Sequence, residues 1–383
     1  MAMPISIARK PHIMVIGHSA GPVLHGSERS LLNILAAVDR QKYDLSCVLP
    51  ERNDVYLQAV ARHTENITVF PYRWWSGTPQ GDPETVSRFE DIFRRGQVNL
   101  VHANTITMMD PLIAAKNVDV PSILHARELI FDNFALANKL GGNPSSIVRT
   151  VQANADFIIA NSNATHRLYY KKDCSFRLYN CVDIDALDMP NEVDPGNLKI
   201  GIISGNHPAK GIELFVRLAI MAAQRRLGLE FMVIGPHTEH TEELARVVQD
   251  AKVPVNIRFM GYTANAVEAV RRVNVVVSFS VAPESFGRSL VEAMAARRPV
   301  IAFDGGGVPE LVRHGTDGFL VPYPNFERAL DHLEAMASNT DCIAVMGRNA
   351  RARAEELSSP AAFASSLNGI YRRILETRVA SLQ

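Results

Sequence analysis

Two glutamates eight residues apart, Glu284 and Glu292, stand out in the segment Val281–Ala296 (VAPESFGRSLVEAMAA). A strand-like run ends near Ser280, and we expect a helix to begin around Gly287–Ser289. The N-terminus of such a helix offers backbone N–H groups and a partial positive charge, which suit a phosphate-bearing ligand. A carboxylate can also accept two hydrogen bonds from a vicinal diol such as that of a ribose. The alternative is a helix-start charge followed by an exposed helix residue.

Two further loops lie between a strand-like run and a helix. In Ser204–Gly211 (SGNHPAKG), Lys210 could reach a ligand and neutralise a diphosphate, or it could be a solvated lysine at a helix start. The segment Gly17–Glu28 (GHSAGPVLHGSE) resembles a phosphate loop but matches neither GxGxxG nor GxxxxGK(S/T). The missing fingerprints argue against a dinucleotide dehydrogenase and a P-loop NTPase.

Polar side chains also follow two other strand-like runs. His125 and Arg127, in His125–Glu128 (HARE), stand two residues apart, so both could face one cleft. The alternative for His125 is a partly buried histidine satisfied by a backbone carbonyl. The segment Asp304–Glu310 (DGGGVPE) contains three consecutive glycines, which form either an adaptable ligand loop or a structural turn.

The sequence offers no convincing metal site. Asp183 and Asp185 have the DxD spacing with which some transferases hold a divalent cation, but they lie where Asp is a common turn former. His237 and His240 are close in sequence, and no third ligand is evident. We therefore expect neither a metal nor another cofactor.

Both tryptophans of the chain, Trp74 and Trp75, lie in the loop-like segment Pro71–Pro79 (PYRWWSGTP). Adjacent tryptophans in a loop could stack on a sugar or rest at a membrane surface. Core packing is the alternative. A peripheral membrane contact through Trp74 and Trp75 is therefore one of the three interpretations of this segment.

The elements that would position these residues form two series. In the first, continuous runs of Val, Ile and Leu indicate parallel strands buried on both faces. These runs predict a Rossmann-like domain over residues 1–182. The expected elements are strands His12–Gly17, Asp44–Leu49, Asn99–His102, Ser122–His125 and Phe157–Ala160, and a helix over Glu28–Val38.

A second series follows Asp183–Gly196, which is rich in Asp, Asn and Pro and which we interpret as a linker over 183–196. It predicts a second doubly wound domain over 197–359, and two such domains would face each other across a cleft. The amphipathic pattern of Pro360–Arg378 predicts a helix within 360–383 that packs on folded structure. The expected strands are Leu198–Ser204, Glu230–Gly235, Val255–Met260, Asn274–Ser280, Pro299–Phe303 and Gly318–Val321, and the expected helices Gly211–Arg226, Glu239–Ala251 and Gly287–Ala296.

Composition sets the broad class. The 383 residues include 40 Lys+Arg and 40 Asp+Glu, and this balance gives no sign of a nucleic-acid partner. No apolar run has the length of a membrane span, and no signal-peptide pattern is evident. The four cysteines show no metal-like spacing. We expect a cytoplasmic protein, in peripheral contact with the inner membrane face if Trp74 and Trp75 provide one.

Taken together, these segments resemble the retaining GT-B glycosyltransferases of family 4. In that family, a strand–loop–helix carries two glutamates separated by seven residues, an alanine-rich turn and a Pro-Val strand. The resemblance covers most of the chain and is best in the C-terminal half. The matching pieces here are Glu284, Glu292, Ala293–Ala296, Pro299–Ile301, Gly306-Gly307, Glu310, Gly318–Val321, Asn180–Asp183 for an Asn-Gly-Val-Asp signature, Lys210-Gly211, and His125–Glu128 for a His-x-Arg-Glu run.

The resemblance implies a role for each matched residue. Glu284 would bind hydroxyls of the transferred sugar, and Glu292 would bind the nucleotide ribose. Lys210 would hold the diphosphate, and Gly26 of the first domain would approach that diphosphate when the cleft closes. His125 would lie by the donor sugar near the reacting carbon. The sugar and diphosphate would be lined by Phe286, Gly287, Arg288 and Ser289. The C-terminal helix would cross back onto the first domain.

Two departures from the family pattern matter. The family usually has an arginine five residues before the lysine, but this chain has Gly205 there. We hypothesise that Arg288 supplies the missing charge, because it belongs to the expected helix N-terminus. Cys181 also replaces the glycine of the family signature.

The implied activity is transfer of a hexosyl-type unit from a nucleoside-diphosphate sugar, such as a UDP- or GDP-sugar, to an acceptor hydroxyl. The configuration at the anomeric carbon would be retained by front-face attack, and cations and N–H groups would hold the diphosphate without a metal. The acceptor would be a glycan, a lipid-linked or a small molecule, as in polysaccharide or glycoconjugate biosynthesis. A nucleotide-sugar 2-epimerase and a non-catalytic sugar-nucleotide-binding subunit remain alternatives, and nothing fixes the oligomeric state.

Overall fold

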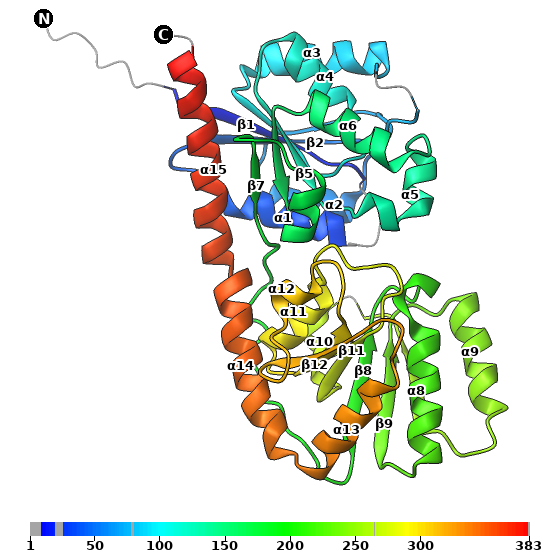
Figure 1. The fold of residues 1–383 in the computed structure, drawn as a ribbon. Helices are drawn as coiled ribbons and strands as arrows, with labels where there is room; N and C mark the ends of the chain where they lie inside the picture. The colour runs from blue at the N-terminus through cyan, green and yellow to red at the C-terminus, as the bar shows by residue number, and fades with distance from the viewer. Residues whose placement is uncertain (1–8, 20–25, 78–79, 264, 382–383) are drawn as a thin grey trace, which may run out of the picture. The chain divides into compact units, whose positions relative to one another are not determined.

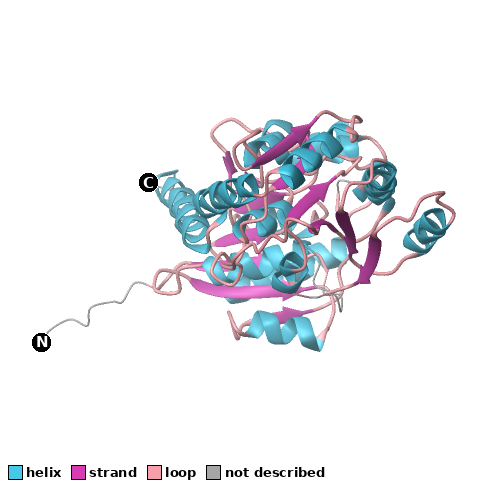
Figure 2. Cartoon of the chain, turned by 90° about the horizontal axis from the view of Figure 1, so that it is seen from below, coloured by secondary structure: helices cyan, strands magenta, loops and turns pink. Residues whose placement is uncertain are grey.

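The structure, a computed structural model, describes residues 9–19, 26–77, 80–263 and 265–381. The chain divides into two compact units: unit 1 comprises Met1–Leu178 and Phe363–Gln383, and unit 2 comprises Tyr179–Ala362. Helices and strands alternate in both units (Figures 1 and 2). Among the described residues, no helix has the length and apolar character needed to cross a bilayer.

Unit 1 is built on a parallel sheet of seven strands in the order β3-β2-β1-β4-β5-β6-β7. Its strands are β1 (His12–Ile16), β2 (Asp44–Leu49), β3 (Ile67–Val69), β4 (Leu100–Ala103), β5 (Ser122–Ala126), β6 (Phe157–Ala160) and β7 (Ser175–Arg177). The chain leaves β1 for β2 and β3 and then returns to β4 on the other side of β1. The topological switch point, where ligands bind in such sheets, therefore lies between β1 and β4.

Helices and a buried aromatic cluster complete unit 1. Phe89 and Phe93 of α3 are buried, and the Phe89 ring lies 4.9 Å from that of Phe70 in an edge-on arrangement. Burying such rings removes a large apolar area from water and fixes the helix on the sheet. The helices are α1 (Gly26–Ala37), α2 (Asp54–Ala61), α3 (Pro83–Gly96), α4 (Asp110–Asn117), α5 (Phe134–Lys139), α6 (Pro144–Asn154) and α7 (Asn163–Leu168).

Unit 2 has a parallel sheet of six strands in the order β10-β9-β8-β11-β12-β13. Its strands are β8 (Leu198–Ile203), β9 (Leu229–Ile234), β10 (Ile257–Gly261), β11 (Val275–Ser278), β12 (Val300–Phe303) and β13 (Gly318–Val321). Its helices are α8 (Ile212–Gln224), α9 (Glu239–Gln249), α10 (Ala266–Arg271), α11 (Arg288–Ala295), α12 (Val308–Leu311), α13 (Arg328–Ser338) and α14 (Asp341–Ser358). The switch point of this sheet lies between β8 and β11. The two doubly wound sheets confirm the predicted α/β class.

The last helix, α15 (Pro360–Ser381), starts in unit 2 and continues as part of unit 1. Asn368 of α15 accepts a hydrogen bond from the backbone N–H of Asp39 at 3.0 Å and donates to the carbonyl of Ala37 at 2.7 Å. The buried side chains Phe363, Leu367 and Tyr371 supply its apolar face. These contacts confirm that the C-terminal helix returns to the first domain (Figure 1).

The segment 183–196, which the sequence predicted as a linker, is grouped with unit 2. Ile184, Leu187 and Met189 are buried in the apolar cluster that contains α11. The exposed Asp183 accepts a hydrogen bond from the N–H of Ala186 at 3.0 Å, which is the turn role expected of Asp here. The polar residues therefore form the outer side of a packed segment.

Leu187→Ala should lower the free energy of unfolding by about 2–5 kcal/mol, because it opens a cavity under a buried side chain. Asp185→Ala, an exposed position of the same segment, should change it by less than about 0.5 kcal/mol. Denaturant titration of both variants measures the difference. Equal stability of the two variants would show that the segment is a solvated linker after all.

Candidate functional site

Lys210 and Glu284 form an ion pair at the switch point of unit 2, on the loops that follow β8 and β11. Lys210 Nζ donates to Glu284 Oε1 at 2.6 Å, and Ser280 Oγ donates to the same oxygen at 2.5 Å. The side chains are 39% and 22% exposed, so both can be reached from solvent. The structure therefore brings together two predicted site residues that are 74 residues apart in sequence.

Two glycines fix this pair by close backbone contact. Gly211 has φ +70°, and a Cβ atom there would lie 1.9 Å from the carbonyl oxygen of Phe279. Gly306 has φ +59°, and its Cβ would lie 2.2 Å from the carbonyl oxygen of Glu284. The same carbonyl accepts a hydrogen bond from the N–H of Gly307 at 2.8 Å. Only glycine allows the β8, β11 and β12 loops to approach each other this closely.

A second ion pair lies on the first turns of α11. Arg288 Nε donates to Glu292 Oε1 at 3.1 Å, and the two side chains are 16% and 7% exposed. This i,i+4 pair places a cation at the helix N-terminus, next to Gly287 and Ser289. The loops after β8 and β11 and the first turns of α11 therefore carry two of the cation–carboxylate pairs of unit 2, and an anionic ligand could take the place of a carboxylate at either cation.

Phe286, predicted to line the ligand through its loop, has a buried ring. Its side chain is 2% exposed and packs against Tyr179, with ring centroids 5.8 Å apart. The ring is therefore part of the core of unit 2, and only the backbone of Phe286 can contribute to a ligand site. The Tyr179 hydroxyl in turn donates to Glu310 Oε2 at 3.0 Å, so Glu310 helps to fix this part of unit 2.

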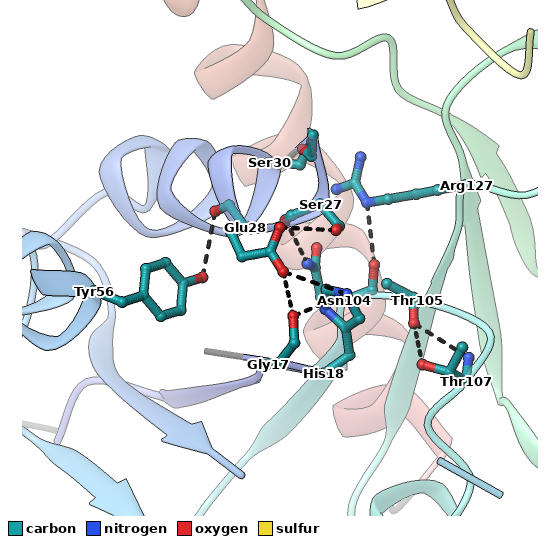
Figure 3. A network of polar contacts seen from close by, with 12 residues as sticks. Gly17, His18, Ser27, Glu28, Ser30, Tyr56, Asn104, Thr105, Thr107 and Arg127 are labelled. Atoms are coloured by element: carbon teal, nitrogen blue, oxygen red, sulfur yellow. Dashed lines mark hydrogen bonds and ion pairs between the residues drawn. The ribbon is translucent and has the colours of Figure 1, made fainter. Parts of the chain in front are cut away.

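In unit 1, a buried polar network surrounds Glu28 at the start of α1 (Figure 3). The Glu28 carboxylate accepts hydrogen bonds from the hydroxyls of Ser19 and Ser27, and His18 Nε2 lies 3.8 Å from it. Burial lowers the pKa of His18, although Glu28 opposes this effect. Asn104, which follows β4, donates to the carbonyl of Ser27 at 3.0 Å. The network thus joins the loops on both sides of the β1/β4 switch point.

His125 lies near the end of β5, and its side chain is fully buried. Its Nδ1 atom lies 3.1 Å from a guanidinium nitrogen of Arg127, whose Nε donates to the carbonyl of Asn104 at 3.1 Å. His102 Nε2 lies 3.3 Å from the same Nδ1 atom. The side-chain contacts of His125 are therefore with other side chains, not with a backbone carbonyl.

The structure describes only part of the two loops singled out in the sequence, the phosphate-like loop before α1 and the loop that contains Trp74 and Trp75. Gly26 is the exposed first residue of α1, and residues 20–25 of the phosphate-like loop lie outside the described chain. Trp75 is 7% exposed and donates its Nε1–H to the carbonyl of Ile106 at 2.8 Å, so for this ring the structure shows the core-packing alternative. Trp74 is 39% exposed, with Lys139 Nζ 5.7 Å from its ring centroid. The residues Thr78 and Pro79 of this loop are not described.

The structure brings Lys210 into contact with Glu284 and Arg288 into contact with Glu292, all in unit 2, whereas His125 and Gly26 belong to unit 1. Glu28, Asn104 and His18 were not predicted as functional residues, although a glutamate just after Gly-Ser at a helix start was a signal for Glu28. The described chain holds no cluster of three or more His, Cys, Asp or Glu with the geometry of a metal site.

Comparison with protein-family models decides the family. Residues 24–186 match the model Glycosyltransferase Family 4, and residues 198–339 match the model Glycosyl transferases group 1. Together the two models cover most of the chain. The chain belongs to the family 4 glycosyltransferases. The predicted family is therefore confirmed.

Curated relatives of this family 4 chain are named after different acceptors. The chain is 28% identical over 153 residues, 40% of its length, to poly(ribitol-phosphate) alpha-N-acetylglucosaminyltransferase of Staphylococcus aureus, of which the match spans 31%. It is 25% identical over 300 residues, 71% of its length, to D-inositol 3-phosphate glycosyltransferase of Rhodococcus erythropolis, of which it spans 67%. It thus spans less than a third of the first of these relatives.

Solved structures confirm the GT-B fold of the family 4 chain. Anabaena HepE in complex with UDP superposes with a TM-score of 0.79 at 21% identity, over 94% of this chain and all of that one (100%). TarM superposes with a TM-score of 0.76 at 12% identity, over 96% of this chain and 100% of that one. Likeness at these identities establishes the fold.

Gly306→Ala should destabilise the family 4 chain by about 1–3 kcal/mol more than Gly315→Ala. Both glycines have positive φ, so the backbone strain is similar, but only Gly306 has a backbone atom in the way of a Cβ; Gly315 has open space. Thermal or denaturant unfolding of the two variants gives the comparison. Equal losses would contradict the close approach of Gly306 to Glu284.

Glu128 offers a pH test, because burial raises the pKa of its carboxyl from 4.5 to about 7. The native chain then holds a proton there that the unfolded chain releases, so this stabilisation is complete below about pH 4.5 and lost as the pH rises through about 7. The free energy of unfolding of Glu128→Gln, taken relative to that of the wild type, should therefore rise by about 2–3 kcal/mol as the pH increases from about 5 to about 8. Glu84→Gln, at an exposed position, is the control and should show no such change with pH. If the difference between Glu128→Gln and the wild type stays constant with pH, the burial of Glu128 is contradicted.

Proposed function

We propose that the chain is a retaining glycosyltransferase that moves a sugar from a nucleoside-diphosphate sugar to an acceptor hydroxyl. The observation that carries this proposal is the pair of cation–carboxylate contacts on unit 2, Lys210–Glu284 at the switch point and Arg288–Glu292 at the start of α11. A cation can bind the diphosphate of such a donor, and a carboxylate can accept hydrogen bonds from its sugar hydroxyls. Each pair therefore contains both kinds of group that bind the donor. The complex of Anabaena HepE with UDP-glucose supports this donor class.

Donor binding would exchange the partners within these pairs. The diphosphate would bind to Lys210 Nζ and to the N-terminal turn of α11, and the Glu284 carboxylate would then accept hydrogen bonds from the hydroxyls of the sugar. Glu292, at 7% side-chain exposure, is the more buried of the two carboxylates and would receive the ribose hydroxyls. Arg288 would add the positive charge that Gly205 lacks.

The chemical step would then be driven by charge stabilisation. The bond between the anomeric carbon and the diphosphate oxygen breaks, and the acceptor oxygen forms its bond on the same face of the sugar. The departing diphosphate oxygen takes the proton of the acceptor hydroxyl. Fixed cations stabilise the negative charge that develops on the leaving group, so the proposed reaction needs no metal.

A thermal-shift screen against UDP-, GDP-, ADP- and TDP-sugars tests donor binding, because a ligand that binds the native state raises its stability. We expect one of these classes to bind the wild type, and Lys210→Ala to weaken its affinity about 10- to 100-fold through the loss of a charge-assisted contact. Arg225→Ala removes an exposed arginine of unit 2 that pairs with Asp331 and Glu334, and it should leave affinity unchanged. Similar losses in both variants would contradict the site.

Two further measurements separate the proposal from its alternatives. Incubation with donor alone should release sugar only slowly and form no epimer, whereas a 2-epimerase would interconvert sugars and a binding subunit would do neither. The product anomer, read by NMR, should match the donor. An inverted product, or a trapped covalent glycosyl-enzyme, would refute the front-face mechanism. If Arg288→Ala leaves donor affinity intact while Lys210→Ala abolishes it, Arg288 does not replace the missing arginine.

A further inference from the structure

A closed cycle of contacts within unit 2 holds the loop that carries Glu284. Phe286, two residues after Glu284, packs against Tyr179 with ring centroids 5.8 Å apart. The Tyr179 hydroxyl donates to Glu310 Oε2 of α12 at 3.0 Å. Gly307, three residues before Glu310, donates its N–H to the carbonyl of Glu284 at 2.8 Å. The contacts therefore lead from Glu284 through Tyr179 and α12 back to Glu284.

Tyr179 begins from a fixed backbone. It is the first residue of unit 2, and the three residues that follow it, Asn180, Cys181 and Val182, are buried. The N–H of Val182 donates to the carbonyl of Ser358, the last residue of α14, at 3.0 Å. The Tyr179 side chain is therefore anchored at its base, while its ring and its hydroxyl contact two different loops.

The second loop, which leads into α12, depends on such contacts. A helix of four residues is too short to be stable through its own hydrogen bonds. Arg353 of α14 donates to the backbone carbonyl of Glu310 at 2.9 Å, and Tyr179 donates to its carboxylate. A hydrogen bond to a carboxylate belongs to the stronger, charge-assisted class. The side chain of Tyr179 therefore helps to hold α12 and the glycine turn before it.

Both loops determine where the Glu284 carboxylate lies. The loop after β11 contains Glu284 itself, and the loop after β12 supports it through Gly306 and Gly307. A shift of α12 would move this support and with it the backbone of Glu284. Hydrogen bonds weaken steeply when donor and acceptor are misaligned, so a small shift of the carboxylate changes how well it can bind a hydroxyl group.

We propose that Tyr179 is a positioning residue that fixes the Glu284 carboxylate for the hydroxyls of the donor sugar, acting through Phe286 and Glu310. This inference rests on the proposed function, which assigns Glu284 to those hydroxyls. It gives the buried ring of Phe286 a role although that ring does not line the ligand. The diphosphate would be held by Lys210 and the first turn of α11, so loss of the Tyr179 hydroxyl should weaken binding of the sugar and not of the nucleoside diphosphate.

Amide hydrogen exchange tests the contact cycle without any ligand. Tyr179→Phe keeps the aromatic ring and removes only the hydroxyl. We expect the Gly307 N–H, which donates to the carbonyl of Glu284, to exchange about three- to tenfold faster, the effect of one lost hydrogen bond. The Gly315 N–H, which donates to the carbonyl of Gly318 at 2.8 Å in the same unit, should keep its rate. An unchanged rate at Gly307 would overturn the positioning role.

Equilibrium binding supplies the functional half of the test. In Tyr179→Phe, the Kd for the UDP-, GDP-, ADP- or TDP-sugar that binds the wild type should rise about three- to tenfold, and the Kd for the same nucleoside diphosphate without its sugar should stay constant. Tyr170→Phe is the matched control, because it removes the same atom from a tyrosine of unit 1 that is 54% exposed. Equal sugar-donor affinity in the two variants, or equal losses for the sugar donor and the nucleoside diphosphate, would refute the proposal.

A double-mutant cycle tests whether Tyr179 acts through Glu310. Glu310→Gln keeps an oxygen that can accept from the Tyr179 hydroxyl, so it should retain more sugar-donor affinity than Glu310→Leu. In the Glu310→Leu background, Tyr179→Phe should cause no further loss, because the hydrogen bond between the two residues is already absent. Losses that add in full would contradict the route through Glu310.

The two claims fail separately. A wild-type chain that binds none of the four classes of nucleoside-diphosphate sugar would contradict the proposed function. The exchange rate of Gly307 would still decide whether the Tyr179 hydroxyl fixes the Glu284 loop, because it is measured without a ligand.

Discussion

The ion pair between Lys210 and Glu284 is the contact on which the proposed chemistry of unit 2 depends. It forms because the loops after β8 and β11 meet at the switch point of the sheet. The approach is possible because Gly211 and Gly306 have backbone oxygens where a Cβ would be. The fold thus holds a lysine and a carboxylate in contact while leaving both partly exposed. A charged, accessible pair at this edge is suited to exchange its partners with a charged ligand.

Unit 1 uses a different electrostatic arrangement at the equivalent edge of its sheet. Around Glu28 and His125, polar groups are buried and joined to each other, and burial keeps the pKa of the histidines low. Arg127 is a cation of this region, and two of its hydrogen bonds go to His125 and to the backbone carbonyl of Asn104. Unit 2 therefore carries its site cations in carboxylate pairs, and unit 1 buries its polar groups in contact with one another.

The sequence predicted most strands because strands buried on both faces are continuous apolar runs; β2, β6 and the edge strand β13 match the expected residues. It missed β3 and β7, which are three-residue edge strands with little buried apolar surface. It also predicted Lys210, Glu284 and Glu292 on the right loops and helix. It could not settle whether the rings of Phe286 and Trp75 and part of the segment 183–196 are buried, because local composition does not show which side chains the core buries. The hydrogen bonds of His102 and Tyr371 join residues 269 apart, which no local pattern reveals.

A crystal structure with a non-hydrolysable nucleoside-diphosphate sugar tests the central claim most directly. The account predicts that the diphosphate contacts Lys210 Nζ and the first turn of α11, that the Lys210–Glu284 contact opens, and that Glu284 and Glu292 receive sugar and ribose hydroxyls. A ligand bound elsewhere on unit 2, with Lys210 still on Glu284, would contradict it.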